Sequence, residues 1–516
     1  MMKNLKQLLL ILCVTGFSIL ASAQKPNIVV ITVDDVAPQD ISVYHRGLGA
    51  VKTPNIDKIA DQGLMLSDYY SQPSCTAGRA AFLTGQYPIR TGLTSVGQPG
   101  SHIGLQAEDI TIAELLKEQG YATAQFGKSH VGDRNEHLPT VHGFDEFFGI
   151  LYHLNMMDMP EQPEFPKDPN FVGRPRNVIY SKASDKDDPT IDPRFGKVGK
   201  QIIEDRGELG SKRQETFDDE VLEISVDWLK RTQKEEKPFF LWFCPSRMHQ
   251  KIFVSNEWRG KSGHGEYTDG LMHLDHIVGG VLDALDEMGV ADNTIVLFTS
   301  DNGVNLEYWP AGGTASFRGE KGTTWDGGYR VPMLVRWPDK IKPGQYSGEF
   351  FTAEDWLPTL MAAVGETDVK EELLEGKEVN DKEYKVYIDG YNQMDVLTGE
   401  GKSKRREFFY YAETDLMAVR VDHWKISFAI KDEWEKAAEQ LPAGMIVDIK
   451  LDPYERTPET PGHFNWSRER TWVLPLFAIP LKDYAKSLQA FPPRQKGSGI
   501  GAAAILKQIE NAKGND

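Results

Sequence analysis

Cysteine is scarce in this chain. Only three occur among 516 residues, at Cys13, Cys75 and Cys244, which is too few for a disulfide framework. On count alone, one bridge between Cys75 and Cys244 remains open. The run at 239–244 around Cys244 is apolar, and a thiol in such a run is usually a small buried apolar group. Cys75 lies among small and polar residues, so a purely structural role fits it poorly.

Positive charge is also in deficit. The chain has 58 Lys and Arg against 76 Asp and Glu, a formal net charge of −18, and an isoelectric point near 5.2. A general nucleic-acid binder needs positive charge to offset phosphate repulsion, so the composition excludes that class. A small anionic substrate stays compatible with it, because a single pocket can be locally positive on an acidic protein.

Hydrophobic runs long enough for a membrane helix are lacking, and the longest apolar run lies at the N-terminus. Two lysines precede an apolar stretch at 8–20, and Ala21-Ser22-Ala23 forms a small-x-small cleavage signal. The stretch is too short to span a bilayer, so residues 1–23 are predicted to be a secretory signal peptide. An uncleaved anchor is the alternative, and a lipoprotein is disfavoured because Leu12 precedes Cys13. We therefore predict a periplasmic or secreted protein that is free of the membrane after cleavage.

Short apolar runs then alternate with helix signals. The runs suit strands buried on both faces, as in parallel sheets, and lie at 28–33, 122–126, 239–243 and 294–299. The helix signals are Thr53-Pro54 before Gly63, a Thr111/Glu114 capping box before Gly120, and an apolar stripe at helical spacing over 268–288. This alternation predicts an α/β fold, with a mostly parallel central sheet flanked by helices.

The character of the chain changes twice more. Residues 158–210 are rich in Pro, Asp and Lys without clear periodicity, which predicts a long surface excursion, a candidate wall of the binding cleft. After 401, closely spaced strand-like runs predict an antiparallel meander, at 408–411, 417–421, 424–428 and 445–449. We therefore expect a catalytic domain at 24–400 and a smaller C-terminal antiparallel-sheet subdomain at 401–516.

Polar residues follow the predicted strands, where ligands bind in open α/β sheets. The first strand ends in Asp34-Asp35, and the strand at 294–299 is followed by Asp301-Asn302. Adjacent buried carboxylates repel one another unless a cation compensates them. Three carboxylates and an amide offer oxygen ligands, which suit Ca²⁺ or Mg²⁺ better than Zn²⁺. Either pair alone would read as helix caps or turn residues, but their matching positions favour a metal site.

Cys75 opens the segment 75–85, which is typical of a short helix ended by Gly85. A residue at a helix N-terminus faces free backbone N–H groups and the positive end of the dipole, a favourable place for an anion. Arg79 lies one helical turn further on and faces the same side. A thiolate nucleophile would explain the cysteine, although the sequence alone shows no Cys–His pairing.

These segments together resemble a known family. The run PNIVVITVDD at 26–35, TPNID at 53–57 and the segment 75–85 resemble the start and the Cys-x-Pro-x-Arg signature of type I sulfatases, in the alkaline phosphatase superfamily. Later blocks match in order, namely GKSH at 127–130, FTSDNG at 298–303, the segment 321–332 and DIKLDP at 448–453. The resemblance covers nearly the whole chain after the signal segment, and it implies an arylsulfatase-type sulfuric ester hydrolase.

The resemblance implies a modified nucleophile and a metal. Cys75 would be oxidised to formylglycine by a maturation enzyme, and its hydrated aldehyde would attack sulfur. The modified Cys75 and Asp34, Asp35, Asp301 and Asn302 would hold one divalent cation, usually Ca²⁺, with Mg²⁺ as the alternative. Two departures from the family pattern are Ala77, where the signature usually has Pro and on which conversion of Cys75 depends, and the minor Asp326, where many relatives have Glu.

The resemblance also implies roles for charged and imidazole groups. Lys128, Lys321 and Arg79 would stabilise the sulfuryl oxygens. His249, aided by Lys321, would protonate the leaving oxygen, and His130 would act as the base that allows sulfate release.

The other histidines are interpreted as structural, except that His45 and His153 stay undecided candidates for the pocket. Arg318, Trp309 and Trp325 flank Lys321 and are candidates for substrate contact.

The leading hypothesis is an exported hydrolase of aryl or carbohydrate sulfates. One alternative is a phosphonate or phosphate-ester hydrolase of the same superfamily, which can use the same aldehyde and one metal. Another is an inactive relative that binds sulfated glycans with Cys75 unconverted. The partners implied are a sulfated small molecule or saccharide and the maturation enzyme.

Overall fold

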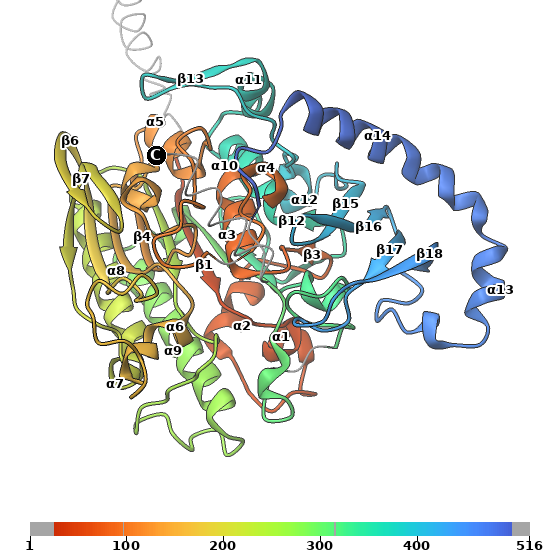
Figure 1. The fold of residues 1–516 in the computed structure, drawn as a ribbon, viewed down its shortest axis with the longest axis horizontal. Coiled ribbons are helices and arrows are strands. Elements are labelled where there is room, and N and C mark those ends of the chain that lie inside the picture. The colour runs from red at the N-terminus through yellow and green to blue at the C-terminus, as the bar shows by residue number, and fades with distance from the viewer. Residues whose placement is uncertain (1–24, 96, 314–315, 498–516) are drawn as a thin grey trace, which may run out of the picture.

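The computed structural model describes residues 25–95, 97–313 and 316–497, so the predicted signal peptide lies outside the described residues. A ten-stranded sheet forms the centre with helices on both faces, and a four-stranded antiparallel sheet lies beside it (Figure 1). The predicted α/β fold class, including the smaller C-terminal antiparallel sheet, is confirmed.

The central sheet has the strand order β11-β2-β10-β9-β1-β8-β4-β5-β6-β7. Its middle strands β9, β1, β8, β4 and β5 run parallel to one another, whereas β10, β6 and β7 pair antiparallel. The strands are β1 Asn27–Val33, β2 Leu64–Leu66, β4 Ala122–Lys128, β5 Glu146–Ile150, β6 Ile179–Asp192, β7 Gly196–Asp205, β8 Phe239–Cys244, β9 Thr294–Ser300, β10 Met333–Arg336 and β11 Gln345–Ser347.

Helices connect and cover these strands. The helices are α1 Ser42–His45, α2 Pro54–Asp61, α3 Cys75–Thr84, α4 Pro88–Thr91, α5 Ile112–Glu118, α6 Leu154–Met157, α7 Ser211–Gln214, α8 Phe217–Gln233, α9 Glu266–Glu287, α10 Trp356–Ala363, α11 Val369–Glu375, α12 Met394–Thr398, α13 His463–Arg468 and α14 Leu474–Ala490. The Thr111/Glu114 capping box at the start of α5 is confirmed. Thr53 precedes α2 as predicted, but its hydroxyl contacts Ser42 and Asp57 instead of capping the helix.

Strand β1 shows why continuous apolar runs predicted a doubly covered sheet. Alternate side chains of a strand point to opposite faces. Ile28 and Val30 pack in one cluster with α3, α5 and α10, whereas Val29 and Ile31 pack in another with α2, α8 and α9. All seven residues of β1 are buried, so the sheet has an apolar core on each face.

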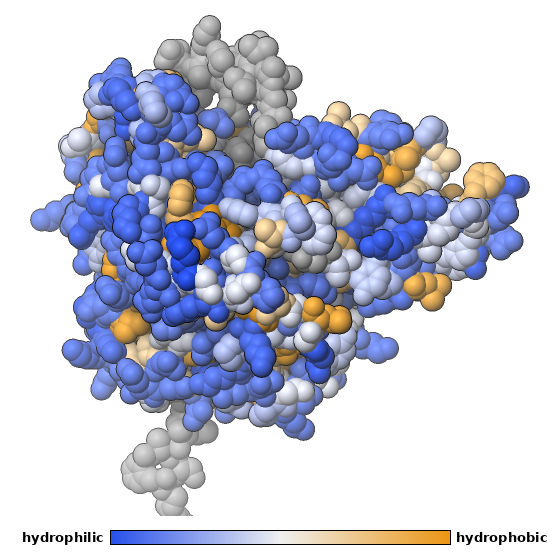
Figure 2. Space-filling view, turned by 90° about the horizontal axis from the view of Figure 1, so that it is seen from below, coloured by the Kyte–Doolittle hydropathy of each residue, from blue (hydrophilic) through white to orange (hydrophobic). Residues whose placement is uncertain are grey.

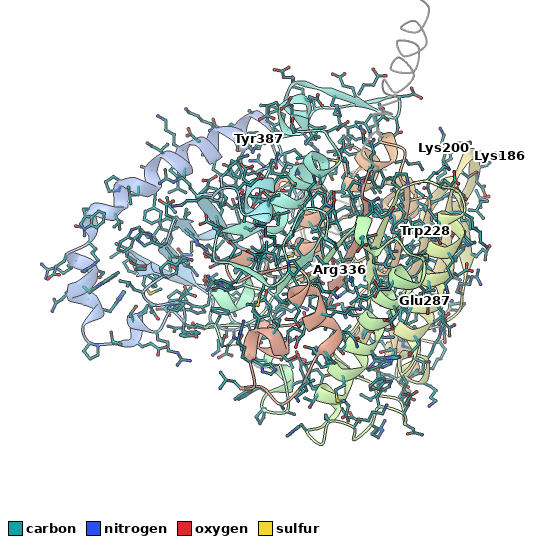
Figure 3. All side chains as sticks on the ribbon, turned by 180° about the vertical axis from the view of Figure 1, so that it is seen from behind. Lys186, Lys200, Trp228, Glu287, Arg336 and Tyr387 are labelled. Carbon is teal, nitrogen blue, oxygen red and sulfur yellow. The ribbon has the colours of Figure 1, made fainter. Side chains whose placement is uncertain are left out.

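The segment 158–210 differs from the prediction of an irregular excursion. Much of it forms the long antiparallel hairpin β6–β7, which extends the central sheet at its edge. Lys186 and Lys200 of this hairpin lie at the margin of the molecule (Figure 3). Its strands are largely exposed and charged, so they lack the apolar alternation that makes a strand recognisable from sequence.

The predicted meander is confirmed as the sheet β15-β16-β17-β18. Its strands are β15 Glu407–Ala412, β16 Asp415–Val421, β17 Trp424–Ile430 and β18 Glu439–Asp448; the remaining short strands, outside both large sheets, are β3 Tyr69–Tyr70, β12 Phe351–Thr352, β13 Lys377–Val379 and β14 Lys382–Tyr384. Helices α13 and α14 arch around the outer side of this sheet (Figure 1). The face seen in Figure 2 is mainly hydrophilic. Apolar side chains are scattered over it, several of them on the part of the molecule that protrudes to the right.

Two further findings concern the cysteines and membrane spans. Cys75 and Cys244 are both free and buried, so the disulfide that the sequence left possible does not form. Cys244 packs in the apolar core as expected.

Within the part of the chain that the structure describes, none of the helices has both the length and the hydrophobicity that a membrane span requires.

Candidate active site

The register of two parallel strands brings the predicted carboxylates together. Val33, the last residue of β1, pairs with Ser300, the last residue of β9. Asp34 and Asp301 therefore leave the sheet side by side. The backbone of Asp34 also exchanges two hydrogen bonds with the segment after β8, through the Arg247 carbonyl at 3.2 Å and the Met248 amide at 2.8 Å. Three parallel strands thus meet at one buried point.

A backbone turn lets both adjacent aspartates face this point. In an extended chain, neighbouring side chains point to opposite faces, but Asp35 has a φ of 57°, in the left-handed region. Asp tolerates this conformation better than most residues. Asn302 donates to Asp35 Oδ1 at 2.6 Å, which joins the two strand ends. One ligand atom each from Asp34, Asp35, Cys75 and Asp301 lies within 4.8 Å of the others.

Helix α3 places Cys75 at the same point, because the helix begins at that residue and is buried throughout. Gly78 permits the close approach: a Cβ there would lie 1.7 Å from the Asp301 carbonyl oxygen. Ser71 donates to that same carbonyl at 2.5 Å. Gly78 is a site-forming residue that the sequence analysis did not single out, and its signal was a glycine inside a helix, where it carries an intrinsic cost.

Three cations surround the carboxylates. Arg79 contacts Asp301 Oδ2 at 2.8 Å and donates to the Lys128 carbonyl at 2.7 Å. Lys128 Nζ forms an ion pair with Asp34. Lys321 donates to Asp35 Oδ1 at 2.6 Å and to Cys75 Sγ at 3.0 Å. All these side chains are almost fully buried, so their charges act in a medium that screens them poorly.

Several oxygens at this point have no hydrogen-bond partner within the described residues. They are Asp35 Oδ2, Asp301 Oδ1 and Asn302 Oδ1. Buried polar atoms rarely remain unpaired without a reason such as a bound ion. The donor set is rich in oxygen, as hard divalent cations prefer, so the residues present fit a divalent metal ion.

Burial and the neighbouring charges perturb the ionisable groups. Burial would raise the pKa of Asp34, but the charges of Lys128, Lys321 and Arg79 lower it well below its usual range. Burial and the adjacent Asp34 raise the pKa of Asp301 to about 6. Burial also raises the pKa of the Cys75 thiol, and the Asp34 charge adds to this effect. An unmodified Cys75 is therefore a poor thiolate nucleophile.

Three imidazole rings lie close to one another beside this point. The His153 ring lies 5.9 Å from that of His130 and 5.5 Å from that of His249, centroid to centroid. Burial lowers the pKa of His130, with a further contribution from the Lys128 charge. Burial and Lys321 lower the pKa of His249 to about 4, and burial and His249 lower that of His153 to about 3. All three rings are thus neutral at pH 7.

The protonated nitrogen of His249 follows from its contact. Nδ1 lies 2.6 Å from the Gln250 carbonyl oxygen, which can only accept, so Nδ1 carries the proton. The lone pair of Nε2 then faces the site, 3.9 Å from Asp35 Oδ2. Neither ring nitrogen of His130 has a hydrogen-bond partner among the described residues, which leaves this ring free to accept a proton.

The structure separates the undecided candidates. His153 lines the cavity above Lys321, together with His249. His45 instead lines a different cavity, beside Tyr267. Trp325 is buried and donates a hydrogen bond to Asp432. The guanidinium carbon of Arg318 lies 3.7 Å from the centroid of the Trp325 ring, so both side chains have structural contacts. Trp309 is 59% exposed and lies outside the cavity lining.

The cavity has a volume of about 470 Å³ and opens over Lys321 and His249. Four chain segments wall it: residues after β5, after β8 and after β9, and the β17–β18 connection. That last wall includes Trp434, which sequence analysis missed because an aromatic residue between charged neighbours carries no catalytic signal. A floor of cations and imidazoles beneath a cavity of this size can bind a small anionic ester.

Comparison with known proteins places these features in context. Residues 26–366 match the family described as Sulfatase. The chain is 32% identical to human arylsulfatase A over 79% of this chain and 76% of that protein. It is 28% identical to canine N-acetylgalactosamine-6-sulfatase over 94% and 88% of the two chains. Among solved structures, the PsFucS1 sulfatase from Pseudoalteromonas sp. has a TM-score of 0.76, with 28% identity and 92% of each chain covered.

Proposed function

The chain belongs to the sulfatase family, whose members are sulfuric ester hydrolases, and we propose that it cleaves aryl or carbohydrate sulfates through formylglycine at position 75 and one divalent cation. The observation that carries this proposal is the register of β1 and β9. It brings Asp34, Asp35 and Asp301 within reach of the first residue of α3.

Asp34, Asp35, Asp301, Asn302 and residue 75 would hold the cation. Unpaired oxygens on Asp35, Asp301 and Asn302 support this assignment, and the oxygen donors favour Ca²⁺, with Mg²⁺ as the alternative. A bound divalent cation supplies positive charge to a sulfate oxygen and lowers the pKa of a hydroxyl beside it.

Formylglycine would supply a hydrated aldehyde, with two hydroxyls on one carbon, at the N-terminus of α3. Cys75 and Ala77 are buried in the folded protein, so the maturation enzyme must act before α3 packs against β9. Ala77 replaces the usual signature proline, and the extent of conversion is therefore the first quantity to measure.

The cations and imidazoles take the remaining roles. Arg79, Lys128 and Lys321 would stabilise the charge of the sulfuryl oxygens in a site where water screens little. His130, neutral and unpaired, would take a proton from the second hydroxyl so that sulfate can leave.

The leaving oxygen would receive its proton from His249, aided by Lys321. The Nε2 lone pair of the neutral ring faces the site. His249 must therefore gain a proton before it can act as an acid. The negative charge of an arriving sulfate favours this protonation.

We further assign residues 24–400 to the catalytic domain and 401–516 to a C-terminal subdomain, and we propose that residues 1–23 direct export. The β17–β18 connection of the subdomain lines the cavity, which supports a role in substrate binding.

Intact-mass analysis of the peptide that contains Cys75, combined with turnover assays, tests the proposal. We expect a formylglycine mass and faster hydrolysis of 4-nitrophenyl sulfate than of the phosphate and phosphonate analogues. Chelation should abolish turnover, release one metal ion per chain and lower the melting temperature, because the ion binds the folded state. An unconverted cysteine would favour a sulfated-glycan-binding protein, and faster phosphonate or phosphate turnover would favour the related hydrolases.

A further inference from the structure

The cavity over Lys321 has walls of opposite charge to its floor. Glu307, Glu320, Glu433 and Glu435 line it, and Lys321 is the one Lys or Arg among its described lining residues. A ligand in this cavity therefore meets positive charge at the sulfate end and negative charge further out.

The four carboxylates are not equivalent. Glu320 is engaged in structure, because it accepts a hydrogen bond from the Leu306 amide at 2.8 Å. Glu433 forms an ion pair with Lys436. Glu307 and Glu435 have exposed side chains, and within the described part of the chain neither has an ion-pair partner within 4 Å. These two carboxylates therefore place negative charge at the open end, or mouth, of the cavity.

Trp434 supplies an aromatic surface between Glu433 and Glu435. Its ring centroid lies 5.5 Å from Lys321 Nζ, and the ring packs over Gly322, where a Cβ would lie 2.2 Å from Trp434 Cε3. The absence of a side chain at Gly322 thus lets the ring lie against the cavity floor. Aromatic rings pack on the apolar faces of sugars, while carboxylates accept hydrogen bonds from hydroxyl groups.

From this arrangement we propose that the substrate is a saccharide with a single sulfate and no second anionic group near it, and that Glu307, Trp434 and Glu435 select it. This inference rests on the proposed function and names its substrate class. A second sulfate or a uronic acid carboxylate at the mouth would face Glu307 and Glu435, and like charges at such sites cost free energy. Apart from Trp434, the residues that line the cavity have polar or charged side chains, which can hydrogen-bond the hydroxyl groups of a sugar ring.

The test compares two substrates that differ by one sulfate group. The metal-loaded, converted enzyme is assayed at fixed ionic strength with a monosulfated neutral disaccharide and with the same disaccharide carrying a second sulfate on the adjacent sugar. We expect kcat/KM to be at least about tenfold higher for the monosulfated form. The double substitution E307Q/E435Q should reduce this ratio about three- to tenfold, and added salt should reduce it in the wild type.

Glu439→Gln is the matched control, because Glu439 is an exposed carboxylate of β18 outside the cavity lining. It should leave the ratio unchanged. Trp434→Ala should raise KM for the monosulfated disaccharide about tenfold, with kcat less affected, and Trp434→Phe should restore much of the loss.

Calorimetric binding of both saccharides to the Cys75→Ala protein gives a readout independent of turnover. Equal or tighter binding and turnover of the disulfated form, or an unchanged ratio in E307Q/E435Q, would overturn the inference while leaving a sulfatase. If the converted enzyme hydrolyses no sulfate ester, the proposed function fails. The binding preference still decides the selectivity in that case.

Discussion

At the scale of single residues, position 75 tests the proposed chemistry most directly. Cys75→Ser keeps one hydroxyl at the N-terminus of α3, beside Lys321 and Asp34. A serine has no second hydroxyl from which a carbonyl could form, so a sulfated serine could not release its sulfate. We expect a nearly inactive variant that retains one sulfuryl group, detected by mass spectrometry after substrate exposure. Continuous turnover without an adduct would show that Cys75 is not the aldehyde precursor.

The loss of activity on replacing His249 should depend on how strongly the leaving group needs a proton. A phenol leaves readily as an anion, whereas a sugar alcohol requires protonation. His249→Ala should therefore lower kcat/KM for a sugar sulfate about 10- to 100-fold more than for 4-nitrophenyl sulfate. Equal losses on both substrates, measured side by side, would contradict the assignment and leave Lys321 as the acid.

Asp40 provides a test of pH dependence away from the metal ligands. Its side chain accepts hydrogen bonds from the Ala37 amide and the Tyr267 hydroxyl, and burial raises its pKa from 3.8 to about 7. The folded protein thus keeps a proton that the unfolded chain releases. The stability from this group is complete below about pH 4 and is lost as the pH rises to about 7.

Asp40→Asn removes this titration while keeping a carbonyl acceptor. We expect the variant to be more stable than wild type at pH 8, by about 1–4 kcal/mol, and to lose that advantage near pH 4. Urea unfolding across this pH range measures the difference. Asp415→Asn, at an exposed position, should show no such trend, and a pH-independent difference for Asp40→Asn would contradict the pKa.

At the scale of elements, the approach of α3 to the end of β9 decides the geometry of the site. Gly78→Ala places a methyl group 1.7 Å from the Asp301 carbonyl and 2.8 Å from Ser71 Oγ. The helix must move, which we expect to cost about 1–3 kcal/mol of stability and most of the activity and metal affinity.

Gly462→Ala is the matched control for this change, because a Cβ at Gly462 meets no atom within 4 Å. The melting temperature, metal content and turnover should all be lower in Gly78→Ala than in Gly462→Ala. Full metal occupancy in Gly78→Ala would show that α3 is not positioned by this contact.

The elements also show where sequence patterns were sufficient. The runs that became β1, β4, β8 and β9 were predicted within about two residues, because burial on both faces demands continuous apolar side chains. The hairpin β6–β7 was missed because it pairs at the sheet edge with exposed, charged strands. There the backbone hydrogen bonds, rather than the apolar pattern, define the structure.

At the scale of the whole molecule, Lys425 joins the C-terminal sheet to the loops of the site. It lies in β17, fully buried, and contacts Asp326 Oδ1 at 3.1 Å and Glu455 Oε1 at 2.7 Å. The Thr324 carbonyl accepts a third hydrogen bond from it, at 3.0 Å. Because Asp326 lies five residues after Lys321, this cluster links the C-terminal sheet to the floor of the cavity.

Lys425→Met leaves two buried carboxylates without their cation. We expect a loss of about 3–5 kcal/mol in the free energy of unfolding, measured in urea. The exposed Lys486→Met should cost less than about 0.5 kcal/mol. Adding Asp326→Asn and Glu455→Gln to Lys425→Met should restore part of the loss, since neither partner of Lys425 then carries a negative charge. A Lys425→Met protein as stable as wild type would contradict the role of this cluster.

The sequence by itself determined the fold class and the family, and it indicated the carboxylates and cations that lie around Cys75. These depend on local information: apolar runs, helix caps, and short segments in a specific order, such as Asp34-Asp35 and the segment that begins at Cys75. Only the tertiary structure decided which of these residues meet. The register of Val33 with Ser300 joins Asp34-Asp35 to Asp301-Asn302, and contacts between residues hundreds of positions apart leave no local pattern.

The same limit applies to the walls of the cavity. His153, Glu307 and Trp434 come from three separate segments, and each side chain reads locally as an ordinary loop residue. Their shared role exists only once the ten-stranded sheet and the C-terminal sheet pack together. The residues of the floor could therefore be predicted from sequence, whereas the proposed selectivity depends on the packed molecule.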